Sequence, residues 1–212
     1  MKKRILILAS GRGSNAAAIM DHAAARPDLM EVVGLVSDRP EAFALEEARK
    51  RKVESFIIAH QNEGSLLSIL RRLKPDWACL AGYKRVLGEK FLKIFWDEKQ
   101  GYYRVLNVHP SLLPAFPGLH GYRQAFVAGV KISGVTVHLV DTGLDSGPIV
   151  LQAPLERQEE DSLASFEERG QRLEHQLFLR ALDLAVGGRL VLKKNPEQKG
   201  NFVSIAERTY GT

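Results

Sequence analysis

A stretch in the middle of the chain carries three side chains that suit acyl chemistry. Asn107 and His109 lie two residues apart at the end of an apolar run, and Asp145 lies in a polar turn after a second apolar run. Because side chains alternate along a strand, Asn107 and His109 should share one face. An amide donor beside an imidazole suits a carbonyl oxygen that gains negative charge, and a carboxylate can hold the imidazole or move a proton. The pattern therefore indicates acyl-type transfer without a protein nucleophile.

The same three residues also allow a purely structural interpretation. Asn107 would then cap a loop, His109 would pack in a turn, and Asp145 would form an Asx-turn. An Asn-x-His triplet is common, so its spacing alone leaves both interpretations open. The sequence shows no sign of a serine or cysteine nucleophile, because Ser111 has no nucleophile elbow around it and Cys79 lies in an apolar run. The scattered histidines show no metal-ligand spacing, so no metal is expected.

The elements that must position these residues alternate between strand and helix patterns. Apolar strand patterns at Arg4–Ala9, Val53–Ala59 and Trp77–Gly82 are separated by helical patterns such as Ala42–Lys52 and Gly64–Lys74. This order predicts an α/β fold with a mostly parallel sheet and helices on both faces. The carboxyl ends of parallel strands meet at one edge of the sheet. The loops that follow these strands should therefore lie beside Asn107 and His109.

The first apolar run ends in a Gly-rich turn that precedes a helical stretch. The turn reads Ser10-Gly-Arg-Gly-Ser-Asn15, and free N–H groups at such a helix start form an anion site. The spacing of Gly11, Gly13 and Ala16 also matches a dinucleotide fingerprint, with Asp38 at the end of the next strand. A nicotinamide-dependent enzyme or a nucleotide-binding module is thus an alternative from another class, and a turn that binds nothing is a third possibility.

The later part of the chain continues the pattern with a strand and a long helix. Ile149–Leu155 should form a hairpin with the preceding apolar run, and Asp161 or Ser162 can cap a helix that ends at Gly187. The run RLVLKK predicts a short edge strand whose lysines discourage pairing. The tail from Asn195 onward shows few turn or core signals, so no element is predicted there.

Composition bounds the class of protein. The 212 residues fit one domain with a small C-terminal addition, and 45% hydrophobic residues are ample for a core. One cysteine excludes an internal disulfide and suits a reducing compartment, so a cytoplasmic protein is expected. The net charge of +5 favours anionic ligands. No basic block is interleaved with aromatics and no run approaches the ~20 apolar residues of a membrane helix, so neither a nucleic-acid nor a membrane partner is expected.

The central motifs resemble those of a known enzyme family. NVHPSLLPAFPG followed by GVTVHLVDTGLDSGPI is similar to the signature of folate-dependent formyltransferases, and residues 1–190 resemble the glycinamide ribonucleotide formyltransferases of purine biosynthesis. The resemblance implies a Rossmann-like formyltransferase fold with a mixed C-terminal part. It also implies one domain over residues 1–190. The N-terminal half of this domain would bind the phosphorylated substrate, and the C-terminal half would bind folate and contain the catalytic residues. Residues 191–212 would form a C-terminal strand and tail.

The family's reaction moves the formyl group of 10-formyltetrahydrofolate, a co-substrate, to the amine of glycinamide ribonucleotide. The resemblance implies small-molecule substrates, no metal, and a monomer or homodimer. Two related classes share the three central residues. Formyltetrahydrofolate hydrolases use water as acceptor and usually carry an N-terminal regulatory domain, and methionyl-tRNA formyltransferases carry an appended tRNA-binding domain. Neither is expected to fit a chain of 212 residues with this Gly-rich loop as well.

The resemblance also assigns roles by position. It makes Asn107, His109 and Asp145 catalytic and gives His138 a supporting role. The residues implied for the phosphorylated substrate are Gly11, Arg12, Gly13, Ser14, Asn15, Gly82, Gln171 and Glu174. The residues implied for folate are Lys84, Arg85, Val86, Leu87, Asn107, Val140, Asp141 and Asp145. Lys84 departs from the apolar residue that is common at its position. The sequence favours a surface loop for His120 and Arg123.

Overall fold

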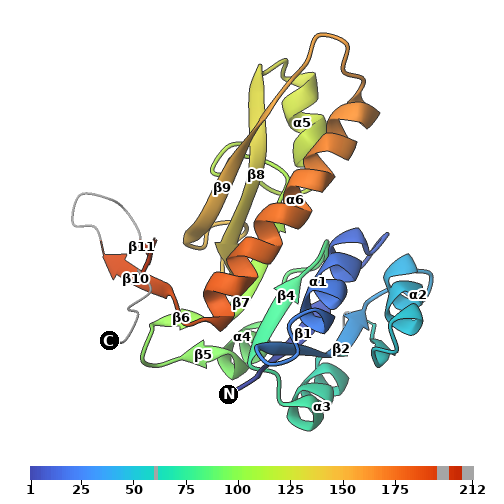
Figure 1. The fold of residues 1–212 in the computed structure, drawn as a ribbon, viewed down its shortest axis with the longest axis vertical. Helices are drawn as coiled ribbons and strands as arrows, with labels where there is room; N and C mark the ends of the chain where they lie inside the picture. Colours follow the sequence, from blue (N-terminus) through green and yellow to red (C-terminus); the bar gives the residue numbers. More distant parts are fainter. Residues whose placement is uncertain (60–61, 195–200, 207–212) are drawn as a thin grey trace.

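The computed structural model describes residues 1–59, 62–194 and 201–206, and its centre is a seven-stranded sheet. The strands lie in the order β3-β2-β1-β4-β7-β8-β9 (Figure 1). Neighbours from β3 to β7 are parallel, whereas β8 runs antiparallel to β7 and to β9. Their bounds are β1 (Lys3–Leu8), β2 (Met30–Ser37), β3 (Ser55–Ile57), β4 (Trp77–Leu80), β7 (Val105–His109), β8 (Ile132–Leu139) and β9 (Ile149–Glu156). The predicted α/β class, the mostly parallel sheet and the mixed C-terminal part are confirmed.

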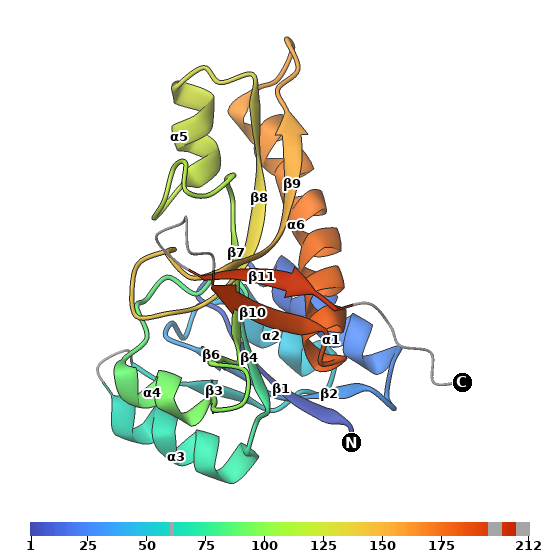
Figure 2. The same ribbon diagram turned by 90° about the vertical axis from the view of Figure 1, so that its left-hand side faces the viewer.

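Helices cover both faces of the sheet because the parallel strands are apolar on both sides. Ile5 and Ile7 of β1 face one core with α1, α2 and α6, while Leu6 and Leu8 face a second core with α3 and α4. The helices are α1 (Ser14–Ala24), α2 (Phe43–Lys50), α3 (Glu63–Leu73), α4 (Glu89–Ile94), α5 (Gly121–Val127) and α6 (Leu163–Val186). The strands β8 and β9 extend beyond the parallel part, and α5 and the first half of α6 accompany them (Figure 2).

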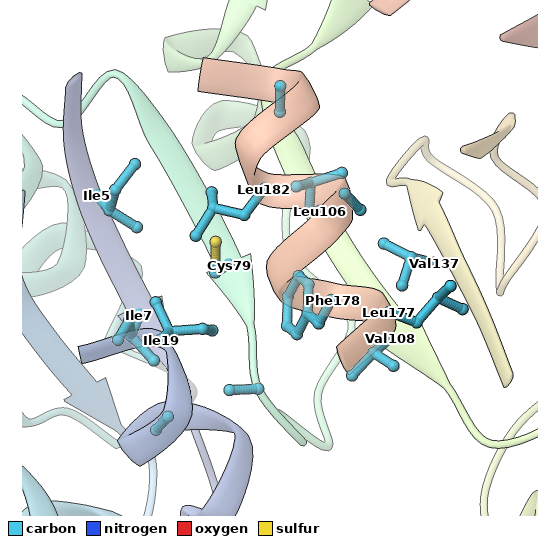
Figure 3. Packing of buried hydrophobic residues seen from close by; sticks show 14 of the residues in the cluster. Ile5, Ile7, Ile19, Cys79, Leu106, Val108, Val137, Leu177, Phe178 and Leu182 are labelled. Carbon is cyan, nitrogen blue, oxygen red and sulfur yellow. The ribbon is translucent and has the colours of Figure 1, made fainter. Parts of the chain in front are cut away.

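The long helix α6 closes the first core across several strands. Its residues Leu177, Phe178 and Leu182 pack over Leu106 and Val108 of β7, as Figure 3 shows. Ser162 caps the helix by accepting a hydrogen bond from the Ser165 N–H, and Gly187 ends it, both as predicted. Cys79 lies in the same core, where burial raises the pKa of its thiol, so it acts as a packing residue.

Several predicted element bounds differ from the structure. The strand predicted over Val53–Ala59 is shortened to Ser55–Ile57, because only three residues pair with β2 at this edge. After α4, which ends at Ile94, a small hairpin of β5 (Trp96–Asp97) and β6 (Tyr102–Tyr103) follows, for which the sequence analysis predicted no strands. In that hairpin Trp96 and Tyr103 pack edge to face with ring centroids 5.0 Å apart.

The prediction for the C-terminal segment was wrong in one respect. The strand β10 (Leu190–Lys194) pairs antiparallel with β11 (Asn201–Ile205), for which no element was predicted. Lysine side chains leave the plane of a sheet, so they leave the backbone ladder of β10 free to pair. The rest of the predicted tail, at 195–200 and 207–212, lies outside the described residues.

Replacement of a buried leucine of α6 should measure how strongly this helix is held. Leu182 is fully buried between α6 and the sheet. Leu182→Ala should lower the free energy of unfolding by about 2–5 kcal/mol, because a cavity remains where the side chain packed. Urea unfolding followed by circular dichroism would measure the loss. Val127→Ala, at a side chain that is 76% exposed, is the control and should change stability by less than about 0.5 kcal/mol.

Candidate active site

The strand β7 divides its side chains between the core and a polar site. Leu106 and Val108 face α6, whereas Asn107 and His109 point to the opposite face. Asn107 is half-buried, and His109 is almost fully buried. In the antiparallel pair with β8, His138 lies directly opposite Asn107. The alternation of β7 and its pairing with β8 therefore place three polar side chains on one patch.

His138 fixes the orientation of the Asn107 amide. The Nδ1–H of His138 donates to the carbonyl oxygen of Leu139 at 2.9 Å, so its Nε2 is free to accept. The Nδ2 of Asn107 donates to this Nε2 at 3.1 Å. Burial lowers the pKa of His138 more than the hydrogen bond to Leu139 and the charge of Asp145 raise it. The imidazole is therefore neutral at pH 7, and it holds the amide with its N–H groups toward the site.

Asp145 brings the polar turn after β8 back to β7. Asp145 adopts a left-handed backbone conformation, with φ of 49°. Its Oδ2 accepts from the Gly118 N–H at 2.8 Å and lies 3.3 Å from the Nδ1 of His109. Its Oδ1 lies 3.5 Å from the Nδ2 of Asn107, the outer limit of a hydrogen bond. The structure thus brings Asn107, His109 and Asp145 together from two segments of the chain.

Both ring nitrogens of His109 face oxygen acceptors. The Nε2–H donates to the carbonyl oxygen of Phe116 at 2.8 Å, while Nδ1 faces the carboxylate of Asp145. A carbonyl and an ionised carboxylate can only accept, so this geometry suits the doubly protonated imidazolium. The side chains of His109 and Asp145 are only 4% and 10% exposed, which strengthens their electrostatic interaction.

A cavity of about 360 Å³ opens in front of these three residues. Residues that were predicted to bind folate line this cavity, together with residues that the sequence analysis did not single out. From the predicted set, the lining contains Gly82, Lys84, Arg85, Val86, Leu87, Asn107, His109, His138, Val140, Asp141 and Asp145. The walls between the polar groups are apolar, and a site of this kind suits an aromatic ligand with a few hydrogen-bonding groups.

Ser10 and Asp38 join the loops at the strand ends behind the cavity. Ser10 N–H donates to Gly82 O at 3.3 Å, and Lys84 N–H donates to Ser10 Oγ at 3.0 Å. Arg85 donates from Nε to the buried Asp38 carboxylate at 2.9 Å. Burial of Asp38 works against its charge, but hydrogen bonds from Ser10 and Arg85 outweigh it and hold its pKa below the usual value. The acid that a dinucleotide site would need is thus engaged with Arg85.

The Gly-rich turn after β1 is shaped by contact with α2. Gly13 has φ of +79°, and a Cβ at this position would lie 2.6 Å from Cα of Ala44. Gly11 O accepts from the Ala44 N–H at 3.1 Å, which holds the turn against the start of α2. Gly13 is the N-cap of α1, and no side chain among the described residues caps that helix end. The N–H groups of Ser14 and Asn15 remain suited to an anion, while the Arg12 side chain is exposed.

Glu174 of α6 is buried beside this helix start. Asn15 donates from Nδ2 to Glu174 Oε2 at 2.6 Å, and Glu174 is 8% exposed. Gln171, one turn earlier on α6, is half-buried. The structure therefore brings Glu174 to the predicted phosphate turn, from a helix more than 150 residues further along the chain.

Among the cavity residues that sequence reasoning missed or placed elsewhere, His120, Leu119 and Leu144 form part of one wall. His120, for which a surface loop was favoured, lines the cavity. It is the N-cap of α5 and has a left-handed backbone with φ of +64°. Leu119 and Leu144 line the cavity too and are 59% and 65% exposed. Leucines in two polar loops are the sequence signal that could have found this wall, because exposed apolar residues often contact ligands.

Two general properties complete the description of the site and its surroundings. Within residues 1–59, 62–194 and 201–206, no group of three or more His, Cys, Asp or Glu side chains is arranged to hold a metal ion. No helix in the described part of the chain is long and apolar enough to cross a membrane.

Comparison with known proteins assigns the fold and the site to a family. The model of the formyl transferase family matches residues 3–182, which include β7, the polar turn and most of α6. The chain belongs to the formyl transferase family. The predicted enzyme class, a formyltransferase, is confirmed.

The relatives point to one branch of that family. The chain is 36% identical over 192 residues to the phosphoribosylglycinamide formyltransferase of Bacillus subtilis, a match that covers 87% of this chain and 95% of the relative. It is 38% identical over 196 residues to the trifunctional purine biosynthetic protein adenosine-3 of Drosophila melanogaster, covering 88% of this chain and 14% of that protein. A crystal structure of glycinamide ribonucleotide transformylase 1 from Symbiobacterium toebii superposes with a TM-score of 0.87 at 37% identity, covering 97% and 95% of the two chains. The predicted resemblance to this branch is confirmed.

Protonation of His138 should destabilise the fold in mild acid. Its pKa is lowered in the folded state, so the unfolded chain binds this proton more readily as the pH falls below the usual histidine value of about 6.5. The free energy of unfolding should then decrease with decreasing pH in this range, and His138→Gln should reduce the decrease. Urea unfolding between about pH 8 and pH 5 would measure both slopes. Equal slopes in the two proteins would show that His138 does not contribute.

Proposed function

We propose that this chain transfers the formyl group of 10-formyltetrahydrofolate to the amine of glycinamide ribonucleotide. The observation that carries the proposal is the buried contact of His109 and Asp145 beside an Asn107 amide that His138 orients. These groups suit a formyl carbon under attack, because its oxygen gains negative charge while a proton leaves the attacking amine. The names of the relatives point to the same reaction.

In the proposed reaction the amine attacks the formyl carbon directly. One Nδ2 hydrogen of Asn107 is taken by His138, and the other, with only a 3.5 Å contact to Asp145, is available for the formyl oxygen. The charge of the His109 imidazolium stabilises the oxyanion at short range. The bond from the formyl carbon to the folate nitrogen then breaks, and the amine proton passes to that nitrogen by way of Asp145 and water. Formylglycinamide ribonucleotide and tetrahydrofolate are the products.

The two substrates are assigned to the two sides of this centre. We assign the folate to the cavity lined by Arg85, Val86 and Leu87, whose apolar walls suit a fused ring system. The phosphate of the ribonucleotide is assigned to the turn of Gly11, Arg12, Gly13, Ser14 and Asn15, where the start of α1 favours an anion. Glu174 and Gln171 are proposed to bind hydroxyl or amine groups of the same substrate.

Three broader expectations stay predictions. They are the division of the chain at residue 190, the cytoplasmic location, and the assembly as a monomer or homodimer. The small-molecule nature of the substrates agrees with the family.

An assay with and without glycinamide ribonucleotide tests whether this amine is the formyl acceptor. The absorbance change of 10-formyltetrahydrofolate should require glycinamide ribonucleotide, because the amine is the nucleophile. Formylglycinamide ribonucleotide should form in equal amount to tetrahydrofolate. Turnover at the same rate without the amine would instead identify a hydrolase, and the phosphate assignment at Gly13 to Asn15 would then lose its support.

Removing the carboxylate at the centre should affect turnover far more than folate affinity. Asp145→Asn keeps the side-chain shape but leaves His109 without its anionic partner, so kcat should fall by about 10²–10⁴-fold while the Kd for folate changes little. Steady-state kinetics and folate fluorescence titration would separate the two effects. Asp97→Asn, at the end of β5, where the side chain accepts from the Lys99 N–H, is a matched control and should leave kcat unchanged. An equal loss of binding and turnover would count against a catalytic role for Asp145.

A further inference from the structure

Another buried carboxylate, at Glu174, lies outside the central group and joins three helices. Tyr122 of α5 donates from its hydroxyl to Glu174 Oε1 at 2.7 Å, and Asn15 of α1 donates to Oε2 at 2.6 Å. All three side chains are more than nine-tenths buried. The helix α6 lies beside both α1 and α5, as Figure 1 shows. The carboxylate is thus the link between the phosphate turn and the outer part of the molecule.

Both contacts have the lengths of hydrogen bonds to an ionised carboxylate. An amide N–H and a phenol O–H each donate to a different oxygen, so Glu174 accepts twice. No salt bridge to Glu174 forms among the described residues. Asn15 Oδ1 is buried and has no hydrogen-bond partner within the described part of the chain. A charged and an uncharged acceptor therefore lie together at the start of α1, and such groups usually meet a donor.

Gly170 makes the Tyr122 contact possible. It lies one turn before Glu174 on α6, and a Cβ there would lie 2.3 Å from Cζ of the Tyr122 ring and 2.6 Å from its hydroxyl oxygen. The ring also packs edge to face with Phe166, with centroids 6.0 Å apart. Burial, and then the charge of Glu174, raise the pKa of Tyr122 far above its usual value, so the hydroxyl remains a donor.

We propose that Tyr122 is a positioning residue whose hydroxyl, admitted by Gly170, fixes the Glu174 carboxylate beside Asn15 for hydroxyl or amine donors of the phosphorylated substrate. The inference rests on the proposed function, because it assigns that substrate to the start of α1. Two donors fix both oxygens of the carboxylate, so it is ordered before the substrate arrives. A free carboxylate on α6 would lose side-chain freedom on binding, and affinity would fall.

The proposal predicts a selective effect on one substrate. Tyr122→Phe removes only the hydroxyl, so the KM for glycinamide ribonucleotide should rise about tenfold, as expected for one hydrogen bond to a charged group. The kcat and the KM for 10-formyltetrahydrofolate should change by less than about twofold. Calorimetric titration with glycinamide ribonucleotide should show the same loss of affinity without turnover.

The matched control is another buried tyrosine. Tyr102→Phe removes the weak hydrogen bond of Tyr102 to Leu190 O, at 3.5 Å, which does not involve Glu174 or Asn15. This variant should leave both KM values unchanged. Thermal unfolding of both variants would show any general loss of stability. A Tyr122→Phe protein that loses stability but keeps its KM for glycinamide ribonucleotide would overturn the proposal.

Gly170→Ala gives an independent test through the backbone. The added methyl group must displace the Tyr122 ring, so the KM for glycinamide ribonucleotide should rise as it does in Tyr122→Phe. In the Tyr122→Phe background the same change should raise this KM little further, because the hydroxyl contact is already lost. Fully additive effects would contradict the proposed route through Tyr122.

Glu174→Gln separates failure of this inference from failure of the proposed function. An unmodified protein that does not formylate glycinamide ribonucleotide contradicts the proposed function itself. If the unmodified protein is active, and Glu174→Gln raises the KM for glycinamide ribonucleotide while Tyr122→Phe does not, then only the role of Tyr122 is excluded.

Discussion

The two-residue period of β7 is the constraint on which the rest of the site depends. Leu106 and Val108 are held in the core by α6, and this fixes Asn107 and His109 on the other face. A slip of one residue would exchange the two sets, so burial of the leucine and valine also selects the polar patch. The neighbours β4 and β8 fix the register further, since Leu80 and His138 lie opposite Asn107. Packing energy and polar geometry are therefore set by the same five residues of the strand.

The carboxylates of Asp145 and Glu174 are both largely buried, but they are held in different ways. Asp145 lies against two histidines, and the loop N–H of Gly118 gives it a fixed position. Glu174 lies against the neutral donors Asn15 and Tyr122. A carboxylate beside a histidine can exchange protons with it, whereas one held by an amide and a phenol offers acceptors in a fixed position. The surroundings of the two acids thus agree with a role in chemistry for the first and in binding for the second.

The fold class and the grouping of Asn107 with His109 could be predicted from the sequence, because local patterns encode them. Apolar runs, the Gly-rich turn and the spacing of Asn107 and His109 are all readable within short windows. The features that could not be predicted depend on contacts between residues far apart in the sequence. The pairing of Asp38 with Arg85 joins two loops, and the burial of Glu174 results from the approach of α1 and α5 to α6. The strand β11 was missed because its pairing with β10, and not its own pattern, makes it a strand.

The bonds between the loops around the cavity have a consequence for how the molecule opens. These loops are joined mainly by hydrogen bonds, of which those of Ser10 and Asp145 cross from one loop to another, while Leu119 and Leu144 over the cavity are exposed. Segments with few buried apolar contacts separate at a small fraction of the global unfolding free energy. We therefore expect the amide protons of the cavity wall to exchange with solvent faster than those of the sheet beneath it. The seven strands of that sheet need not take part in this local opening.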